Sequence, residues 1–174
     1  MYQENNIFVF EDEEEAYPIS TRPAKAGEEG LIYEMALALA RSEGEVLNTL
    51  PVTKENLHRF GFCENPLFHT EFVEYQNKVV GYALYFYTFS SSQGYPILYI
   101  EDLYVKPEYR SMGMGKELFK KLATYAIQKN CCRLEWHVYS WNTSAAKFYQ
   151  KLGSSSRRDL IQTRLEKKDL FKLF

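Results

Sequence analysis

A strand, a glycine-containing loop and a helix follow one another in the middle of the chain, and this succession constrains the fold more than any other stretch. The apolar, β-prone run 97–105 is stopped by Pro107, and a strongly helical segment follows from Lys116. The loop between them contains Gly113 and Gly115. Glycine lets a backbone approach a ligand closely, and a helix start leaves amide N–H groups unpaired. The stretch therefore predicts a loop that can hold a phosphate or pyrophosphate.

The pattern of this loop is Arg-x-x-Gly-x-Gly, with Arg110 supplying a fixed positive charge at its entrance. It matches neither the Gly-x-x-x-x-Gly-Lys-Ser/Thr loop nor the Gly-x-Gly-x-x-Gly dinucleotide fingerprint. A Gly-x-Gly before a helix is also common where the chain only turns and binds no ligand. The loop alone therefore leaves open whether it binds an anion or only turns the chain.

Composition favours one globular domain with no nucleic-acid partner. The 174 residues are 45% hydrophobic and 16% aromatic, which is enough to build one core. The net charge is −2 and the basic residues are scattered, so no basic face for nucleic acid is expected. The N-terminus lacks a basic segment followed by an apolar one, and no apolar run is long enough for a bilayer. We expect a cytoplasmic protein with no membrane contact.

The three cysteines, Cys63, Cys131 and Cys132, show no spacing typical of a metal site or a disulfide framework. We expect free thiols in a reducing compartment and no bound metal.

Hydrophobic periodicity and turn residues divide the chain into elements. Residues 1–17 end in the acidic run 11–15 and are expected to form a disordered tail, while residues 18–174 are expected to form the folded domain. Strands are predicted at 18–23, 70–75, 79–88, 97–105, 133–139, 162–165 and 170–174, and helices at 28–41, after Thr53, at 116–129 and at 143–152. Strands and helices mix without strict alternation. The predicted fold is therefore α/β, with a central, mostly antiparallel twisted sheet flanked by about four helices.

Several of these residues together resemble a known family. The Arg110-x-x-Gly113-x-Gly115 loop after an apolar strand resembles the acetyl-CoA pyrophosphate loop of the GNAT superfamily of N-acetyltransferases. The run 98–105, with Trp141-Asn142 and Phe148-Tyr149 downstream, resembles the branch that acetylates diamines and thialysine. This resemblance covers about residues 19–174, and it implies acetyl-CoA as cosubstrate, a small-molecule amine as acceptor and a homodimer.

The resemblance also implies which residues bind the cofactor. The backbone of the strand and the loop would bind the pantetheine arm and the pyrophosphate, and residues near the next helix would touch the arm or a phosphate. These residues are Leu103, Tyr104, Val105, Arg110, Ser111, Met112, Gly113, Met114, Gly115, Lys116, Asn142, Ser144 and Lys151. For Asn142 and Ser144 the alternative is helix capping.

Amine acetylation requires a proton acceptor for the amine and a proton donor for the departing thiolate. Glu101 is the candidate acceptor, because an acid inside an apolar strand is costly to bury without a role. The alternative is that Glu101 and Asp102 lie at a strand end, hydrated or paired with Arg110. The residue pattern alone favours a core role for Tyr149, whereas by resemblance Tyr149 is the general acid for the thiolate.

Acidic residues would attract a cationic substrate, and Glu43, Glu101 and Asp102 are the candidates. The chain departs from the family in one feature that affects binding of a cationic substrate. Polyamine acetyltransferases carry Asp-Pro-Trp in the loop after the third strand, whereas this chain has Ser90-Ser91-Ser92. The loss of an acid and an indole makes a thialysine-like or other small primary amine as plausible as a long polycation.

The functional hypothesis is an acetyl-CoA-dependent N-acetyltransferase for a small primary amine, acting by direct attack in a ternary complex. One alternative is acetylation of a protein or peptide amine. Another is a non-catalytic acyl-CoA-binding module, which would need neither Glu101 nor Tyr149. His69 and His137 are considered as bases, but a hydrogen-bonded histidine in the core or at a sheet edge is favoured for both.

Overall fold

The computed structural model describes residues 19–46, 51–157 and 159–174. The chain divides into two compact units, one up to His137 and one from Val138 to the C-terminus. The expected acidic tail lies outside the described residues.

The first unit is built on a five-stranded sheet of order β1-β2-β3-β4-β5. The strands are β1 (Ser20–Pro23), β2 (His69–Tyr75), β3 (Lys78–Ser90), β4 (Tyr95–Val105) and β5 (Leu134–Trp136). The first four strands pair antiparallel with their neighbours, and β5 pairs parallel with β4. The predicted mixed, mostly antiparallel sheet is therefore confirmed.

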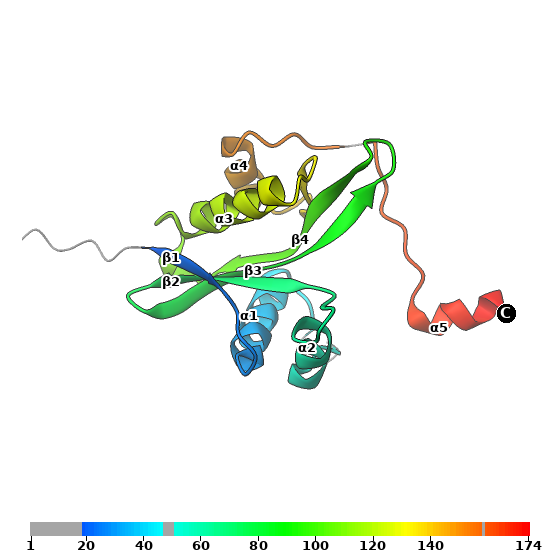
Figure 1. Ribbon diagram of the computed structural model, residues 1–174, viewed down its shortest axis with the longest axis horizontal. Helices are drawn as coiled ribbons and strands as arrows, with labels where there is room; N and C mark the ends of the chain where they lie inside the picture. Colours follow the sequence, from blue (N-terminus) through cyan, green and yellow to red (C-terminus); the bar gives the residue numbers. More distant parts are fainter. Residues whose placement is uncertain (1–18, 47–50, 158) are drawn as a thin grey trace, which may run out of the picture. The chain divides into compact units, whose positions relative to one another are not determined.

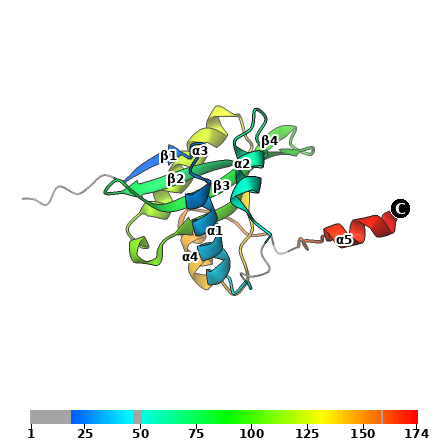
Figure 2. The ribbon, with the colours of Figure 1, turned by 90° about the horizontal axis from the view of Figure 1, so that it is seen from below.

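Helices cover both faces of this sheet (Figure 1, Figure 2). α1 (Glu29–Ser42) and α2 (Lys54–Gly61) lie on one face, and α3 (Met114–Gln128) lies on the other. The first face is filled by a buried cluster from α1, α2 and the three central strands, comprising Ile32, Met35, Leu57, Phe72, Tyr82 and Tyr104. On the second face α3 buries Leu118 and Leu122, in keeping with its helical apolar period.

Local sequence explains several boundaries. The hairpin between β2 and β3 turns at Gln76 (φ 52°) and Asn77 (φ 59°), and two adjacent residues with positive φ are typical of the tight hairpin turn predicted there. α2 begins after Thr53, whose hydroxyl accepts a hydrogen bond from the Asn56 N–H at 3.1 Å.

The second unit contains α4 (Thr143–Lys151), the short helix α5 (Lys167–Leu170) and a final turn of 3-10 helix, Phe171–Leu173. α4 ends as predicted, with Gly153 at φ 87° directly after its last turn. The two strands predicted at 162–165 and 170–174 were wrong. Residues 162–165 have neither helix nor strand, and 170–173 are helical.

The C-terminal prediction failed because β-prone side chains form a strand only beside a partner strand, which a local pattern does not supply. The strand predicted at 133–139 was too long for a related reason: β5 has only the three residues that pair with β4. Of the helices in the described parts of the chain, none is long and apolar enough to cross a membrane.

Candidate functional site

The glycine loop connects β4 to α3, and its backbone N–H groups have no hydrogen-bond partners among the described residues. After a single 3-10 turn, Pro107–Tyr109, the chain passes through Ser111 (φ 63°) and Gly113 (φ 94°) and enters α3 at Met114. None of the six N–H groups from Ser111 to Lys116 donates a hydrogen bond to a described residue. Six free N–H groups at a helix start can together surround an anion such as a pyrophosphate.

The two glycines of the loop have different positions. Gly113 precedes the helix with the left-handed backbone that only glycine adopts without strain, and a β-carbon added there would lie 3.6 Å from Ile19 Cδ1. Gly115 lies inside the first turn of α3, because the helix begins two residues earlier than the predicted Lys116. Ser111, Met112 and Gly113 are all exposed, so the loop is open to a ligand.

Arg110 contacts the last two residues of β4. Its Nε donates to the Val105 carbonyl at 2.9 Å, and its guanidinium lies 5.6 Å from the centre of the Tyr104 ring. The described contacts contain no ion pair between Arg110 and Glu101 or Asp102, which was one part of the alternative for these acids. Glu101 is exposed, which agrees with the other part, a hydrated acid. The charge of Arg110 is therefore fixed beside the loop and remains exposed.

Glu101 interrupts the pairing of β4. Asp102 lies opposite Leu84 and Ile100 opposite Tyr85, so Glu101 is the extra residue of a β-bulge. The partner strand β5 pairs only with Leu98–Ile100. The edge of β4 from Glu101 to Val105 therefore has no described strand on the β5 side. Apart from the Val105 carbonyl, which accepts from Arg110, the backbone groups of this edge are open to an extended, peptide-like ligand.

Acidic side chains meet near this bulge on the α1 side of the sheet. The Tyr82 hydroxyl donates to Asp102 Oδ2 at 2.6 Å. Burial, together with the charges of Glu101 and Glu45, raises the pKa of Asp102, although the Tyr82 hydrogen bond offsets part of that rise. Burial and the charge of Asp102 likewise raise the pKa of Glu43, which follows the last turn of α1. The structure thus brings together Glu43, Glu101 and Asp102, the three acids predicted to attract the substrate.

Sequence reasoning did not identify two tyrosines in this region. Tyr82 is fully buried beneath Asp102, and Tyr99 hydrogen-bonds through its hydroxyl to His137 Nδ1. Burial raises the pKa of Tyr99, and the charges of Glu101 and Glu135 add to the rise. His137 thus forms a hydrogen bond next to the sheet, as expected. Strand alternation could not have placed both tyrosines, because the bulge at Glu101 shifts the alternation of β4 between Tyr99 and Asp102.

The remaining predicted residues belong to the second unit. Asn142 caps α4 by accepting a hydrogen bond from the Ala145 N–H at 3.1 Å, which is the capping role that had been left open. Ser144 and Lys151 are exposed, and Tyr149 is half-buried with its ring 5.4 Å from that of Phe148. The role of Tyr149 therefore belongs to the proposal below.

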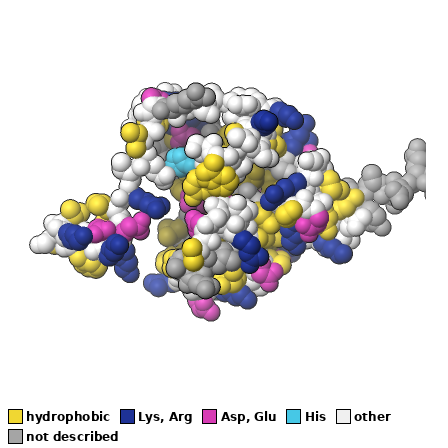
Figure 3. Space-filling model, turned by 180° about the vertical axis from the view of Figure 1, so that it is seen from behind, with side chains coloured by type: hydrophobic (Ala, Val, Ile, Leu, Met, Phe, Trp, Pro, Cys, Tyr) yellow, Lys and Arg dark blue, Asp and Glu magenta, His cyan; other side chains and the backbone are white. Residues whose placement is uncertain are grey.

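The face of the molecule drawn in Figure 3 carries charges of both signs. On the face drawn in Figure 3, basic and acidic side chains are interspersed among the described residues. The described part of the chain contains no group of three histidine, cysteine or acidic side chains that could hold a metal ion. The distinctive features of the site are therefore the free N–H groups, the open strand edge and the acidic cluster.

Comparisons with known proteins agree with this geometry. Residues 32–154 match the model of the acetyltransferase (GNAT) family. A thialysine N-epsilon-acetyltransferase from Sus scrofa is 38% identical over 149 residues, which cover 81% of this chain and 85% of that protein. A spermidine/spermine N(1)-acetyltransferase-like protein 1 from Homo sapiens is 33% identical over 140 residues, covering 76% of this chain and 20% of that protein.

Among solved structures, an integron cassette protein from the mobile metagenome of V. cholerae superposes with a TM-score of 0.73 at 28% identity. The match covers 89% of this chain and 96% of that one. The family match spans most of the sequence and contains the strand, the glycine loop and the acidic bulge. The chain is therefore an N-acetyltransferase that belongs to the acetyltransferase (GNAT) family.

Proposed function

We propose that this enzyme transfers the acetyl group of acetyl-CoA to a small primary amine by direct attack in a ternary complex. The observation that carries the proposal is the position of an acidic cluster, Glu43, Glu101 and Asp102, beside an open strand edge that leads into a loop with six free N–H groups. The loop offers donors to a pyrophosphate, the edge offers backbone to a pantetheine arm, and the cluster offers negative charge to an ammonium group.

The first step is removal of a proton from the amine. A primary ammonium with a pKa of about 10.4 is neutral in only about one part in two thousand at pH 7. Glu101 is exposed at the bulge and can accept this proton, directly or through a water molecule. Glu43 and Asp102 hold the cationic end of the substrate.

The neutral amine then attacks the thioester carbon. A backbone N–H of the open edge, for which Leu103 is the candidate, stabilises the negative charge on the oxygen of the tetrahedral intermediate. When the intermediate collapses, the C–S bond breaks and Tyr149 gives its hydroxyl proton to the thiolate of CoA. The extra proton on the attacking nitrogen leaves to water, and Tyr149 takes a proton back from solvent, so that a neutral amide remains. The products are an amide and CoA, and no covalent enzyme intermediate forms.

The substrate is proposed to be a thialysine-like amine rather than a long polyamine. The relative from Sus scrofa is a thialysine acetyltransferase. The hydroxyls of Ser90 and Ser92, at the turn between β3 and β4, are hydrogen-bonded to each other at 3.3 Å. Polyamine acetyltransferases carry an acid and an indole in this turn. Fewer charges in that turn weaken binding of a long polycation more than of a short amine.

A thiol-release assay over thialysine, lysine, ornithine, putrescine, spermidine and a short peptide tests the proposal through relative kcat/KM. The proposal expects the highest values for thialysine or another short diamine. Fastest turnover on the peptide would contradict the substrate class, and binding of acetyl-CoA without CoA release on any amine would contradict the reaction.

The role of Tyr149 has its own test. Tyr149→Phe should leave the Kd of acetyl-CoA unchanged and lower kcat by about 100-fold or more, because it removes the proton donor for the thiolate. Tyr139→Phe, an exposed tyrosine of the same unit, is the matched control and should keep full kcat. Unchanged turnover of Tyr149→Phe would remove this residue from the mechanism.

A further inference from the structure

A cavity lies at the far end of α3 from the glycine loop. It has a volume of about 610 Å³, and it reaches from the start of β2 and the end of α2 to Gln128 and Lys129 at the end of α3. α3 has 15 residues, which corresponds to a length of about 22 Å. None of the residues assigned to acetyl transfer lines this cavity. A volume in this range suits a small organic ligand.

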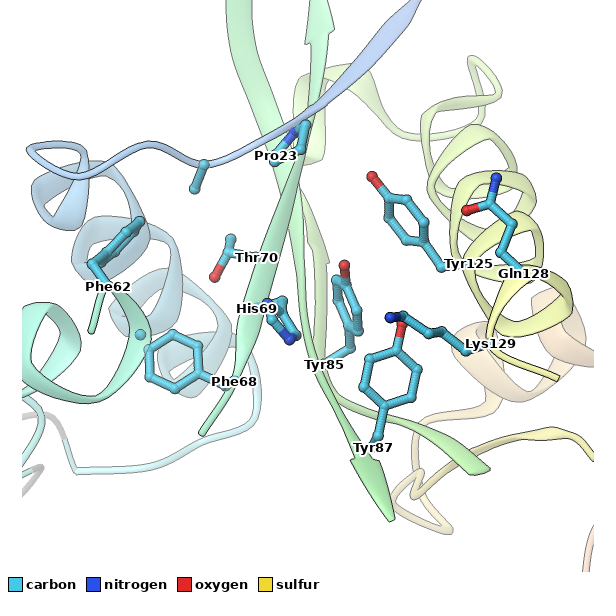
Figure 4. A pocket seen from close by; sticks show the side chains of 12 residues that line it. Pro23, Phe62, Phe68, His69, Thr70, Tyr85, Tyr87, Tyr125, Gln128 and Lys129 are labelled. Carbon is cyan, nitrogen blue, oxygen red and sulfur yellow. The ribbon is translucent and has the colours of Figure 1, made fainter. Parts of the chain in front are cut away.

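The walls of the cavity are aromatic. On the α3 side, Tyr85 stacks on Tyr125 with ring centres 5.8 Å apart, and His69 lies 5.4 Å from Tyr85 and 6.1 Å from Tyr87. On the other side Phe62 and Phe68 line the cavity, as Figure 4 shows. Flat aromatic walls of this kind favour a planar, unsaturated ligand over a branched aliphatic one.

Several polar groups that face the cavity, among them the tyrosine hydroxyls and the Gln128 amide, can donate a hydrogen bond, although each can also accept one. Among the described residues that line it, Lys129 alone carries a full charge. Burial, and to a smaller extent the charge of Lys129, lowers the pKa of His69, so its imidazole is neutral at pH 7 and keeps one N–H. In Figure 4 the side chains of Lys129 and Tyr87 point toward the same part of the cavity. None of the described residues that line it carries a carboxylate, so the charge of Lys129 favours a negative group there.

Thr70 lines the cavity with only 6% of its surface exposed. Its Oγ1 is closed off from solvent and has no hydrogen-bond partner among the described residues, so it is not a group that the cavity offers to a ligand. The hydroxyls of Tyr85 and Tyr87 likewise make no hydrogen bond to a described residue.

Glu71, a buried acid outside the cavity lining, does not reverse the preference of the cavity for a negatively charged ligand. Glu71 is fully buried and lies outside the cavity lining, and its Oε2 accepts a hydrogen bond from Tyr125 at 3.0 Å. Burial raises the pKa of Glu71, which disfavours negative charge behind the aromatic wall.

We propose that this cavity is a binding site for a small aromatic carboxylate, whose ring packs on the tyrosine wall and whose carboxylate pairs with Lys129. An aromatic amine of the same size would place its cation beside the Lys129 ammonium group, with no carboxylate in the lining to offset the repulsion. The site is separate from the proposed acetyl-transfer chemistry and does not depend on it.

Isothermal titration calorimetry on the full chain tests the site with two pairs of probes that share a ring system. 4-Hydroxyphenylacetate is compared with tyramine, and indole-3-acetate with tryptamine. We expect the acids to bind with a Kd between about 0.1 and 1 mM, which is reasonable for ligands of this size, and at least 10-fold more tightly than the amines. Equal binding of acid and amine, or no binding of either acid, would overturn the proposal.

Substitutions of lysines test whether the aromatic acids bind in this cavity. Lys129→Met should weaken binding of both acids at least 10-fold, while Lys121→Met should not change it. Lys121 is the matched control because it lies on the same helix and stacks on Tyr125, 5.0 Å from the ring centre, without lining the cavity. Thermal unfolding of both variants checks that each is folded. If the two variants bind alike, or if saturating CoA displaces the acids, the assignment of the site to this cavity is wrong.

Discussion

The hydroxyl of Tyr82 on β3 donates a hydrogen bond of 2.6 Å to Oδ2 of Asp102 on the neighbouring strand β4. Tyr82 is fully buried, and burial raises the pKa values of both groups. The bond thus connects the hydrophobic core beneath α1 to the acidic cluster beside the bulge. It keeps a carboxylate available for a cationic substrate where burial alone would favour the neutral acid.

Removing this bond should reduce stability. Tyr82→Phe leaves the Asp102 carboxylate without its donor, and an unsatisfied buried group costs about 1 to 3 kcal/mol. Urea unfolding at pH 7.5 measures the loss. Tyr104→Phe is the matched control, because Tyr104 lies directly opposite Tyr82 in the sheet, is also buried, and its hydroxyl makes no hydrogen bond to a described residue. Equal losses in the two variants would contradict the assigned role of the bond.

Asp102 should also make stability depend on pH. Its pKa is raised in the folded state, so the neutral acid stabilises the fold, and this contribution is lost as the pH rises through the folded pKa. Asp102→Asn removes the titration. We expect the variant to gain about 0.5 to 2 kcal/mol over the wild type at pH 8, and much less at pH 4, near the ordinary pKa of aspartate. A gain that is the same at both pH values would contradict this assignment.

Glu101→Gln should slow the proposed reaction without weakening cofactor binding. Loss of the proton acceptor is expected to lower kcat/KM for the amine by about 100-fold or more at pH 7, with an unchanged Kd for acetyl-CoA. The defect should shrink toward pH 10, because more of the amine is then already neutral. Glu135→Gln is the control, since Glu135 is an acidic residue on β5 whose carboxylate pairs with Arg133. A defect of the same size at every pH would argue against a role in proton transfer.

The sequence predicted the parts of this fold that depend on local geometry. Gln76 and Asn77 turn the hairpin, Thr53 caps α2, and Gly153 ends α4, because each effect involves residues only a few positions apart. The two C-terminal strands were wrong because a strand needs a partner distant in the sequence, and propensity carries no information about that partner.

The sequence predicted the motif residues of the candidate site but not the contacts that depend on strand register. The glycine loop and the acids Glu43, Glu101 and Asp102 could be named from their motifs, and the structure brings these acids into one region. The bulge at Glu101 and the contact from Tyr82 could not be predicted, because both depend on the register between β3 and β4. The cavity near Lys129 has no sequence motif, since its lining comes from several separate elements.

Gly113→Ala tests whether the loop contacts acetyl-CoA, and Gly94→Ala is the control for backbone strain. Gly113 has φ 94° and Gly94, in the turn between β3 and β4, has φ 73°, with open space around it. Alanine at either position should cost about 1 to 2 kcal/mol of stability through left-handed strain. Only Gly113→Ala should also weaken acetyl-CoA, by about 10-fold or more, as measured by calorimetry. Equal affinities in the two variants would mean that the loop does not contact the cofactor.

The most direct measurement is an NMR titration of the ¹⁵N-labelled enzyme with acetyl-CoA, following the backbone amides from Ser111 to Lys116. These six N–H groups donate to no described residue in the structure. If they surround the pyrophosphate, their proton resonances will move downfield on saturation, while those of Gln128 and Lys129 at the other end of α3 stay in place. If the six resonances do not move while acetyl-CoA binds, the loop is not the pyrophosphate site.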